Sequence, residues 1–151
     1  MVPDAARGDA GVMATSMHTS LRPASRSRTP WPLVLTLAAV ALVRPLLNIT
    51  GLADDWGRPA TPVLATVAVT AVWVAGVLVT RQPDPVRVLA LTGLAYAGLA
   101  TVLSGVLSPI LDGELHGPLT NPVALAAVCA VNAAWGALAG MIALRLRRRR
   151  P

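Results

Sequence analysis

Arg44 is the most unusual residue in this sequence, because it stands inside an apolar run that carries no other charge, in the stretch LVRPLLNITG at 42–51. A guanidinium stays protonated in proteins, and a charge in a bilayer is costly unless it reaches water or a partner. Pro45 follows and has no amide hydrogen for the Ala41 carbonyl, which predicts a bend or an end of the helix. Three interpretations stay open: Arg44 extends to the membrane surface, pairs with a carboxylate, or binds a substrate.

A weak internal repeat indicates which carboxylate would pair with Arg44. LVRPLLN at 42–48 aligns with VLSPILD at 106–112, so Ser108 corresponds to Arg44 and Asp112 to Asn48. The positive charge is therefore confined to the first half, and Asp112, or Glu114 two residues later, supplies the opposite charge. We expect Arg44 to face the other helices and to pair with Asp112 or Glu114, which would join the two halves at their outer ends.

Few other residues could do chemistry. Asn132 lies in the last apolar run, where an amide predicts an interhelical hydrogen bond in preference to a ligand contact. Cys129 is the single cysteine, and His18 and His116 are the only histidines. No nucleophile with a general base, and no Cys/His metal set, can be assembled from these residues. We therefore predict that the chain is not an enzyme and that it has no catalytic residues, no metal site and no cofactor.

The composition indicates an integral membrane protein. Of the 151 residues, 54% are hydrophobic and only 13% are charged, and the mean hydropathy is +0.61. Soluble domains carry about 25% charged residues. Each apolar run is long enough to cross a hydrocarbon core as a helix. We expect an all-α four-helix bundle with transmembrane spans at 31–50, 60–80, 86–111 and 119–144.

The arginines predict the orientation of these spans. Eleven of the thirteen lie in the N-terminal tail, the connector between the second and third spans, and the C-terminal tail. By the positive-inside rule both termini are cytoplasmic, in a domain at 30–144 flanked by a disordered tail at 1–29 and a polybasic tail at 145–151. The polybasic tail is expected to contact anionic lipid headgroups, and the high isoelectric point does not indicate nucleic-acid binding. Cleavage of the first span as a signal peptide is disfavoured, because the apolar run continues well beyond the small residues at 39–41.

The repeat predicts two tandem two-helix units. The return helix of each unit would start with an N-cap residue followed by a first-turn proline. These pairs are Thr61 with Pro62, and Asn121 with Pro122. Small residues at four-residue spacing allow close approach of a neighbouring helix. We predict that the third and fourth spans pack through such residues, or that the fourth mediates a homodimer; the residues are Gly93, Ala97, Thr101, Gly105, Gly136 and Gly140.

Three stretches of the sequence together resemble an uncharacterised family of small four-span bacterial integral membrane proteins, over about residues 31–144. These stretches are RPLLNITGL, PATPVLATV and GLAYAGLATVLSGVLSPILDGELHGPLTNP. The resemblance implies four spans and a location in the bacterial cytoplasmic (inner) membrane, and it implies no activity. From the residues themselves we expect a non-enzymatic accessory or assembly protein acting through helix–helix association, as a homodimer or with another membrane subunit. The alternative is a small transporter or channel working as an oligomer. It is weakened by the absence of an acidic residue inside the spans.

Overall fold

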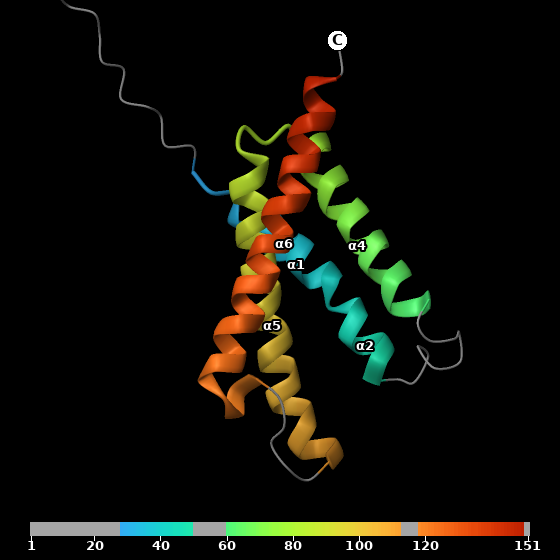
Figure 1. Cartoon of the computed structure of the whole chain (residues 1–151), viewed down its shortest axis with the longest axis vertical. Helices are drawn as coiled ribbons and strands as arrows, with labels where there is room; N and C mark the ends of the chain where they lie inside the picture. Colours follow the sequence, from blue (N-terminus) through green and yellow to red (C-terminus); the bar gives the residue numbers. More distant parts are fainter. Residues whose placement is uncertain (1–27, 50–59, 113–117, 150–151) are drawn as a thin grey trace, which may run out of the picture.

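The computed structural model describes residues 28–49, 60–112 and 118–149. Over these residues the chain is helical and has no strand (Figure 1), so the expected all-α class is confirmed for this part of the protein. The elements are α1 (Trp31–Ala41), α2 (Val43–Ile49), α4 (Ala60–Val79), α5 (Pro85–Asp112), the short 3-10 helix η1 (Pro118–Thr120) and α6 (Pro122–Arg148).

Three of the helices, α4, α5 and α6, are long and apolar enough to cross a membrane. Their candidate spans hold 19, 26 and 27 residues, which agrees with the second, third and fourth spans expected from the sequence. The fourth begins later than expected, because residues 118–120 form the separate 3-10 turn. It also extends beyond its expected end at residue 144, since Arg145, Arg147 and Arg148 form the last turn of α6.

The expected first span is divided into two helices at Leu42. Pro45 has no amide hydrogen to donate to the Ala41 carbonyl oxygen. Before it, Leu42 donates to the Ala39 carbonyl oxygen at 3.0 Å, three residues back and not the four of an α-helix. Helical bonding resumes where Leu46 donates to the Leu42 carbonyl oxygen at 3.2 Å. Pro45 therefore breaks the helix in the turn that precedes it, as its missing donor predicts.

The two proposed halves of the repeat differ at this point. Pro109, which aligns with Pro45, lies inside α5, and that helix continues to Asp112. The aligned prolines therefore have different structural consequences.

The closest pair of helices is α5 and α6, which lie side by side (Figure 1). A Cβ atom added at Gly93 would overlap the Asn132 carbonyl oxygen, and one added at Gly136 would overlap the Leu89 carbonyl oxygen. The two backbones are thus in direct contact at both places, a separation that only glycine permits. Such contacts allow close packing without any apolar side chain between the helices.

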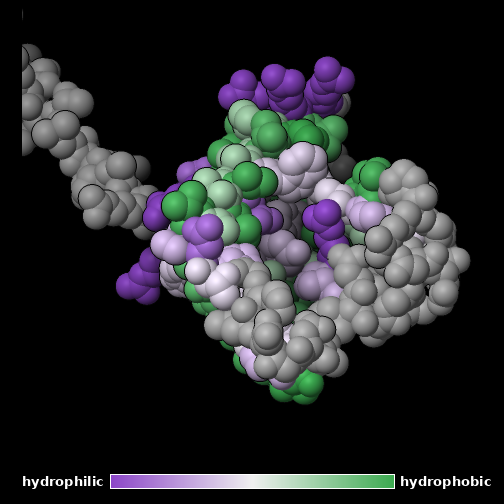
Figure 2. Space-filling model, turned by 60° about the horizontal axis from the view of Figure 1, so that its bottom comes forward, coloured by the Kyte–Doolittle hydropathy of each residue, from purple (hydrophilic) through white to green (hydrophobic). Residues whose placement is uncertain are grey.

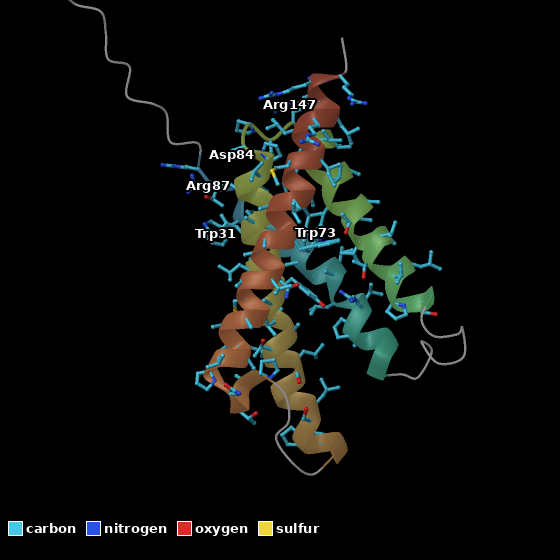
Figure 3. All side chains as sticks on the ribbon, viewed as in Figure 1. Trp31, Trp73, Asp84, Arg87 and Arg147 are labelled. Atoms are coloured by element: carbon cyan, nitrogen blue, oxygen red, sulfur yellow. The ribbon has the colours of Figure 1, made fainter. Side chains whose placement is uncertain are left out.

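The buried core lies where α1 and α4 cross this pair. Trp73 of α4 is only 3% exposed and stands at this crossing (Figure 3). Its indole Nε1–H donates to the Leu37 carbonyl oxygen of α1 at 2.9 Å, which satisfies the one polar atom of a buried tryptophan. Around it pack Val34, Leu37, Ala41, Val77, Val88, Leu89, Ala139 and Ala143.

Of the three long helices, α4 is the least covered by the rest of the chain. Within its most apolar window 11% of the residues are buried, against 33% for α5 and 17% for α6. In Figure 1, α4 and α2 diverge from the α5–α6 pair towards the end of the molecule at which α5 ends.

Local capping signals fix two helix starts. Asn121 accepts the Val123 amide at 2.9 Å and the Ala124 amide at 3.4 Å through its side chain, so its predicted role as N-cap of α6 is confirmed. Asp84 caps α5 in the same way by accepting the Arg87 amide at 3.1 Å. By contrast, α4 begins at Ala60, one residue before the expected cap Thr61.

Candidate functional site

A cavity of about 30 Å³, lined by both polar and apolar side chains, lies where α1 and α2 face α4, α5 and α6. Among its described lining residues Arg44 is the one with a charge; the others are Ala41, Thr66, Val69, Thr70, Trp73, Tyr96, Asn132 and Trp135. Seen from the end at which α5 ends and α6 begins, the molecule is hollowed between its helices, and hydrophilic atoms stand in the hollow (Figure 2). The cavity thus brings a permanent charge together with three aromatic rings and three neutral polar side chains.

The break at Leu42 helps to place Arg44 on this wall. Arg44 is half-buried and lies at the start of α2, just after the break. Its side chain and that of Tyr96 from α5 line the same cavity. Of the three interpretations left open by the sequence, the geometry favours those in which Arg44 faces the other helices.

Internal hydrogen bonds already use the donors of the two threonines and the two tryptophans on the cavity wall. Thr66 donates its hydroxyl to the Pro62 carbonyl oxygen, and Thr70 donates to that of Thr66, each at 2.7 Å. The indole of Trp135 donates to the Thr70 hydroxyl oxygen at 3.1 Å and so joins α6 to α4. This bond links the two proposed halves of the chain at the cavity.

Asn132 lies on the same wall, and its amide bonds within its own helix. Nδ2 donates to the Val128 carbonyl oxygen at 2.8 Å, in place of the interhelical bond that the sequence predicted. Its second amide hydrogen is left for the cavity, since an amide nitrogen carries two donors. The backbone of Asn132, against Gly93, makes the contact with α5.

The predicted carboxylate partners of Arg44 cannot be placed. The side chain of Asp112 and the whole of Glu114 lie outside the described residues. Asp84 is the acidic residue whose side chain is described, and it caps α5 at the opposite end of that helix. The pairing of Arg44 with Asp112 or Glu114 therefore stays a prediction.

The predicted packing residues lie in two places. Gly93, Gly136 and Gly140 stand where a Cβ would meet the backbone of the facing helix. Gly105 lies against the Leu119 side chain of η1. Ala97 is fully buried in α5, and Thr101 is 5% exposed. The Thr101 hydroxyl oxygen is buried without a hydrogen-bond partner among the described residues.

A second hollow, which we call the α4–α6 groove, runs along the outside of the cavity wall. It measures about 470 Å³ and is lined almost wholly by apolar atoms. On α4 its wall includes the small residues Ala71 and Ala75, one helical turn apart; the full lining is Val67, Thr70, Ala71, Val74, Ala75, Leu78, Trp135, Ile142 and Leu146. An adjoining hollow of about 310 Å³ shares Thr70, Trp135 and Ile142 and reaches Arg145. The Trp135–Thr70 bond separates the groove from the Arg44 cavity, since both residues line both spaces.

Apart from Arg44, the arginines that the structure describes gather around the start of α1, the α4–α5 turn and the end of α6. Arg147 donates to the Gln82 carbonyl oxygen at 2.9 Å, which ties α6 to this turn. A hollow of about 180 Å³ at the same end is lined by Arg28, Arg87 and Asp84, among others. Figure 3 shows Asp84, Arg87 and Arg147 together at this end of the molecule.

Sequence reasoning missed the contribution of Tyr96 to the cavity. It is the only tyrosine of the chain, and the polar tip of its ring, in the middle of a long apolar helix, is the signal that could have found it. Thr70 and Trp73 each lie 62 residues before Asn132 and Trp135, a spacing close to that of the internal repeat, and all four residues line the cavity. Trp135 is 47% exposed and lines both the cavity and the groove.

The described residues contain no group of three or more His, Cys, Asp or Glu side chains that could hold a metal ion. The cavity offers hydrogen bonding, one positive charge and aromatic surface, which suit binding. Comparison with models of protein families, with curated proteins and with solved structures returned no match. The resemblance to bacterial four-span proteins therefore stays a prediction.

Proposed function

We propose that this chain is a four-span protein of the bacterial cytoplasmic membrane with both termini in the cytoplasm. We further propose that it works without catalysis, as an accessory or assembly protein that binds a transmembrane helix of a partner protein. The binding site in this proposal is the α4–α6 groove. The observation that carries it is the poor coverage of α4 by its own chain next to a concave apolar surface.

The arrangement of charge supports the orientation. The arginines at one end of the molecule are all exposed, which suits a cytoplasmic face that also meets anionic headgroups; in the described part they are Arg28, Arg81, Arg87, Arg145, Arg147, Arg148 and Arg149. The divided first span, α1 with α2, holds 19 residues from 31 to 49. At ~1.5 Å per residue it would measure about 28 Å, close to a ~30 Å hydrocarbon core.

The shape of the groove supports a helix as its occupant. Ala71 and Ala75 form a small-xxx-small step on α4, and such steps let a second helix approach closely. Large side chains of α6, Trp135 and Ile142, form the opposite wall. The partner helix would therefore present large aliphatic side chains to α4. A carboxylate near its cytoplasmic end would complement Arg145.

The test is affinity purification of the tagged full chain from its native membrane in mild detergent. Ala71→Phe fills the groove, and the matched control Val72→Phe places the same ring on an exposed position of α4 outside the groove. We expect a partner in stoichiometric amount with the wild type and with Val72→Phe, and its loss with Ala71→Phe. The proposal fails if no stoichiometric partner appears, or if only a second copy of the chain is recovered.

A second candidate function is a small carrier, and one observation favours it. The helix break at Leu42 lies beside the Arg44 cavity, and discontinuous helices line the binding sites of many secondary transporters. Reconstituted protein can be screened for solute and ion flux across liposomes. Consistent silence in that screen would remove this candidate.

A further inference from the structure

We propose that the Arg44 cavity is a binding site for one small monovalent anion, of the size of chloride. The inference concerns the chain itself and needs neither the partner helix nor transport. It starts from the lining of the cavity, in which Arg44 is charged and the other described residues are neutral.

A bound anion would balance the charge of Arg44 in the cavity. Arg44 is half-buried, and it lines the cavity together with Trp73, which is 3% exposed. A positive charge in such surroundings is destabilising unless water or a negative charge lies close to it, because the low dielectric strengthens both its desolvation cost and its attraction to a counter-charge. Among the described lining residues, the oxygen atoms are all neutral.

The donors on the wall match an anion better than a cation or a neutral solute. Arg44 carries five N–H groups, and Tyr96 and Asn132 add a hydroxyl and an amide. The hydroxyls of Thr66 and Thr70 donate to backbone carbonyl oxygens within α4. The donors available to a bound species are therefore those of Arg44, Tyr96 and Asn132, which belong to α2, α5 and α6.

The volume and the single charge limit the ligand. About 30 Å³ is more than the ~10–15 Å³ that one water molecule needs on this measure of volume. A halide ion or the carboxylate end of a small organic acid fits such a space. One guanidinium also balances one negative charge and no more.

Two cavity residues provide a direct readout, because Trp73 and Trp135 both line the site. The full chain carrying Trp31→Phe and Trp56→Phe, in nanodiscs of neutral lipid and gluconate buffer, would be titrated with iodide, which quenches indole fluorescence. We expect a saturable quenching component, competed by chloride and not by sulfate. Competition by acetate as well would extend the ligand class to small carboxylates, whereas competition by chloride alone would restrict it to halide-sized ions, and either result supports the site.

Charge variants locate the site. In Arg44→Gln the apparent dissociation constant should rise about tenfold or more, and Arg44→Lys should retain saturation if Arg44→Gln fails to fold. Arg145→Gln, which removes the same charge at the other end of the molecule, should leave the titration unchanged. Linear quenching in the wild-type background, or equal loss with Arg145→Gln, would overturn the proposal. So would saturation that appears only in Asp112→Asn or Glu114→Gln, because it would show that a carboxylate of the chain occupies Arg44.

Discussion

The contact between α5 and α6 makes a sharp prediction for two glycines that look alike in the sequence. Gly136 lies in α6 against the backbone of α5, whereas Gly98 lies in α5 and has open space where a Cβ would stand, with nothing within 4 Å. Gly136→Ala and Gly98→Ala therefore add the same methyl group in opposite environments. The first should destabilise the protein, and the second should leave its stability unchanged or slightly raised.

The magnitude follows from the distances around Gly136. An added Cβ would stand 2.7 Å from the Leu89 carbonyl carbon and 3.2 Å from the Ala90 Cα, whereas carbon atoms in ordinary contact are ~3.5–4.0 Å apart. The two helices would have to separate by roughly 1 Å at this point, and forced overpacking of this kind costs about 1–3 kcal/mol. Gly98→Ala should instead gain up to about 1 kcal/mol from helix propensity.

The assay is unfolding of the detergent-purified chain by titration with sodium dodecyl sulfate, followed by circular dichroism. Fluorescence provides a second probe, because Trp135 is the immediate neighbour of Gly136. Gly136→Ala should move the midpoint to lower detergent fraction, and Gly98→Ala should not. If the two variants unfolded at the same midpoint, the direct backbone contact between α5 and α6 would be refuted.

Three further predictions use the same unfolding assay. Arg81 adopts a φ of 50° after α4, in the turn where the Gln82 amide donates to the Val77 carbonyl oxygen. Arg81→Gly should therefore raise the free energy of unfolding by about 1 kcal/mol, because glycine favours this conformation. Arg81→Ala removes the same charge without the gain, and equal midpoints for the two variants would contradict the backbone argument. Trp73→Phe keeps an aromatic ring but loses the bond to the Leu37 carbonyl and part of the buried volume, so it should cost at least about 1 kcal/mol, while Trp31→Phe at an exposed site should change nothing. Thr101→Val replaces a buried hydroxyl that has no partner among the described residues, and it should stabilise by about 0.5–1 kcal/mol; a loss of stability would indicate that this hydroxyl is bonded.

The features that the sequence predicted well are those that depend on local chemistry. Long apolar runs mark α4, α5 and α6, because backbone groups in lipid must be satisfied within a helix. Asn121 is a cap because its side chain reaches the next amides, whatever the rest of the chain does. Pro45 breaks its helix because it lacks a donor. Each of these features needs only a few neighbouring residues.

The faces that meet could be predicted only where glycine marks them. In an apolar span every face is hydrophobic, so periodicity does not distinguish the buried side from the lipid-facing side. Gly93 and Gly136 are informative because close approach excludes a side chain. The polar tip of Tyr96 marks it as a residue in need of a partner without showing which helix it faces, and the place of Tyr96 and Trp135 at the cavity follows from the way in which α4 leans away from the α5–α6 pair. The bonding of Asn132 within its own helix was missed for a related reason, since sequence does not show which acceptor lies nearest.

The central claim is that α4 offers its α6-facing side to a partner helix, and photo-crosslinking in intact cells tests it most directly. A diazirine-bearing amino acid would be placed at Ala75, in the groove, or at Val72, which is exposed on α4 outside it. The account predicts one discrete adduct with a different membrane protein from position 75, absent from position 72 and abolished by Ala71→Phe. Adducts with lipid alone, or the same protein adducts from both positions, would contradict it.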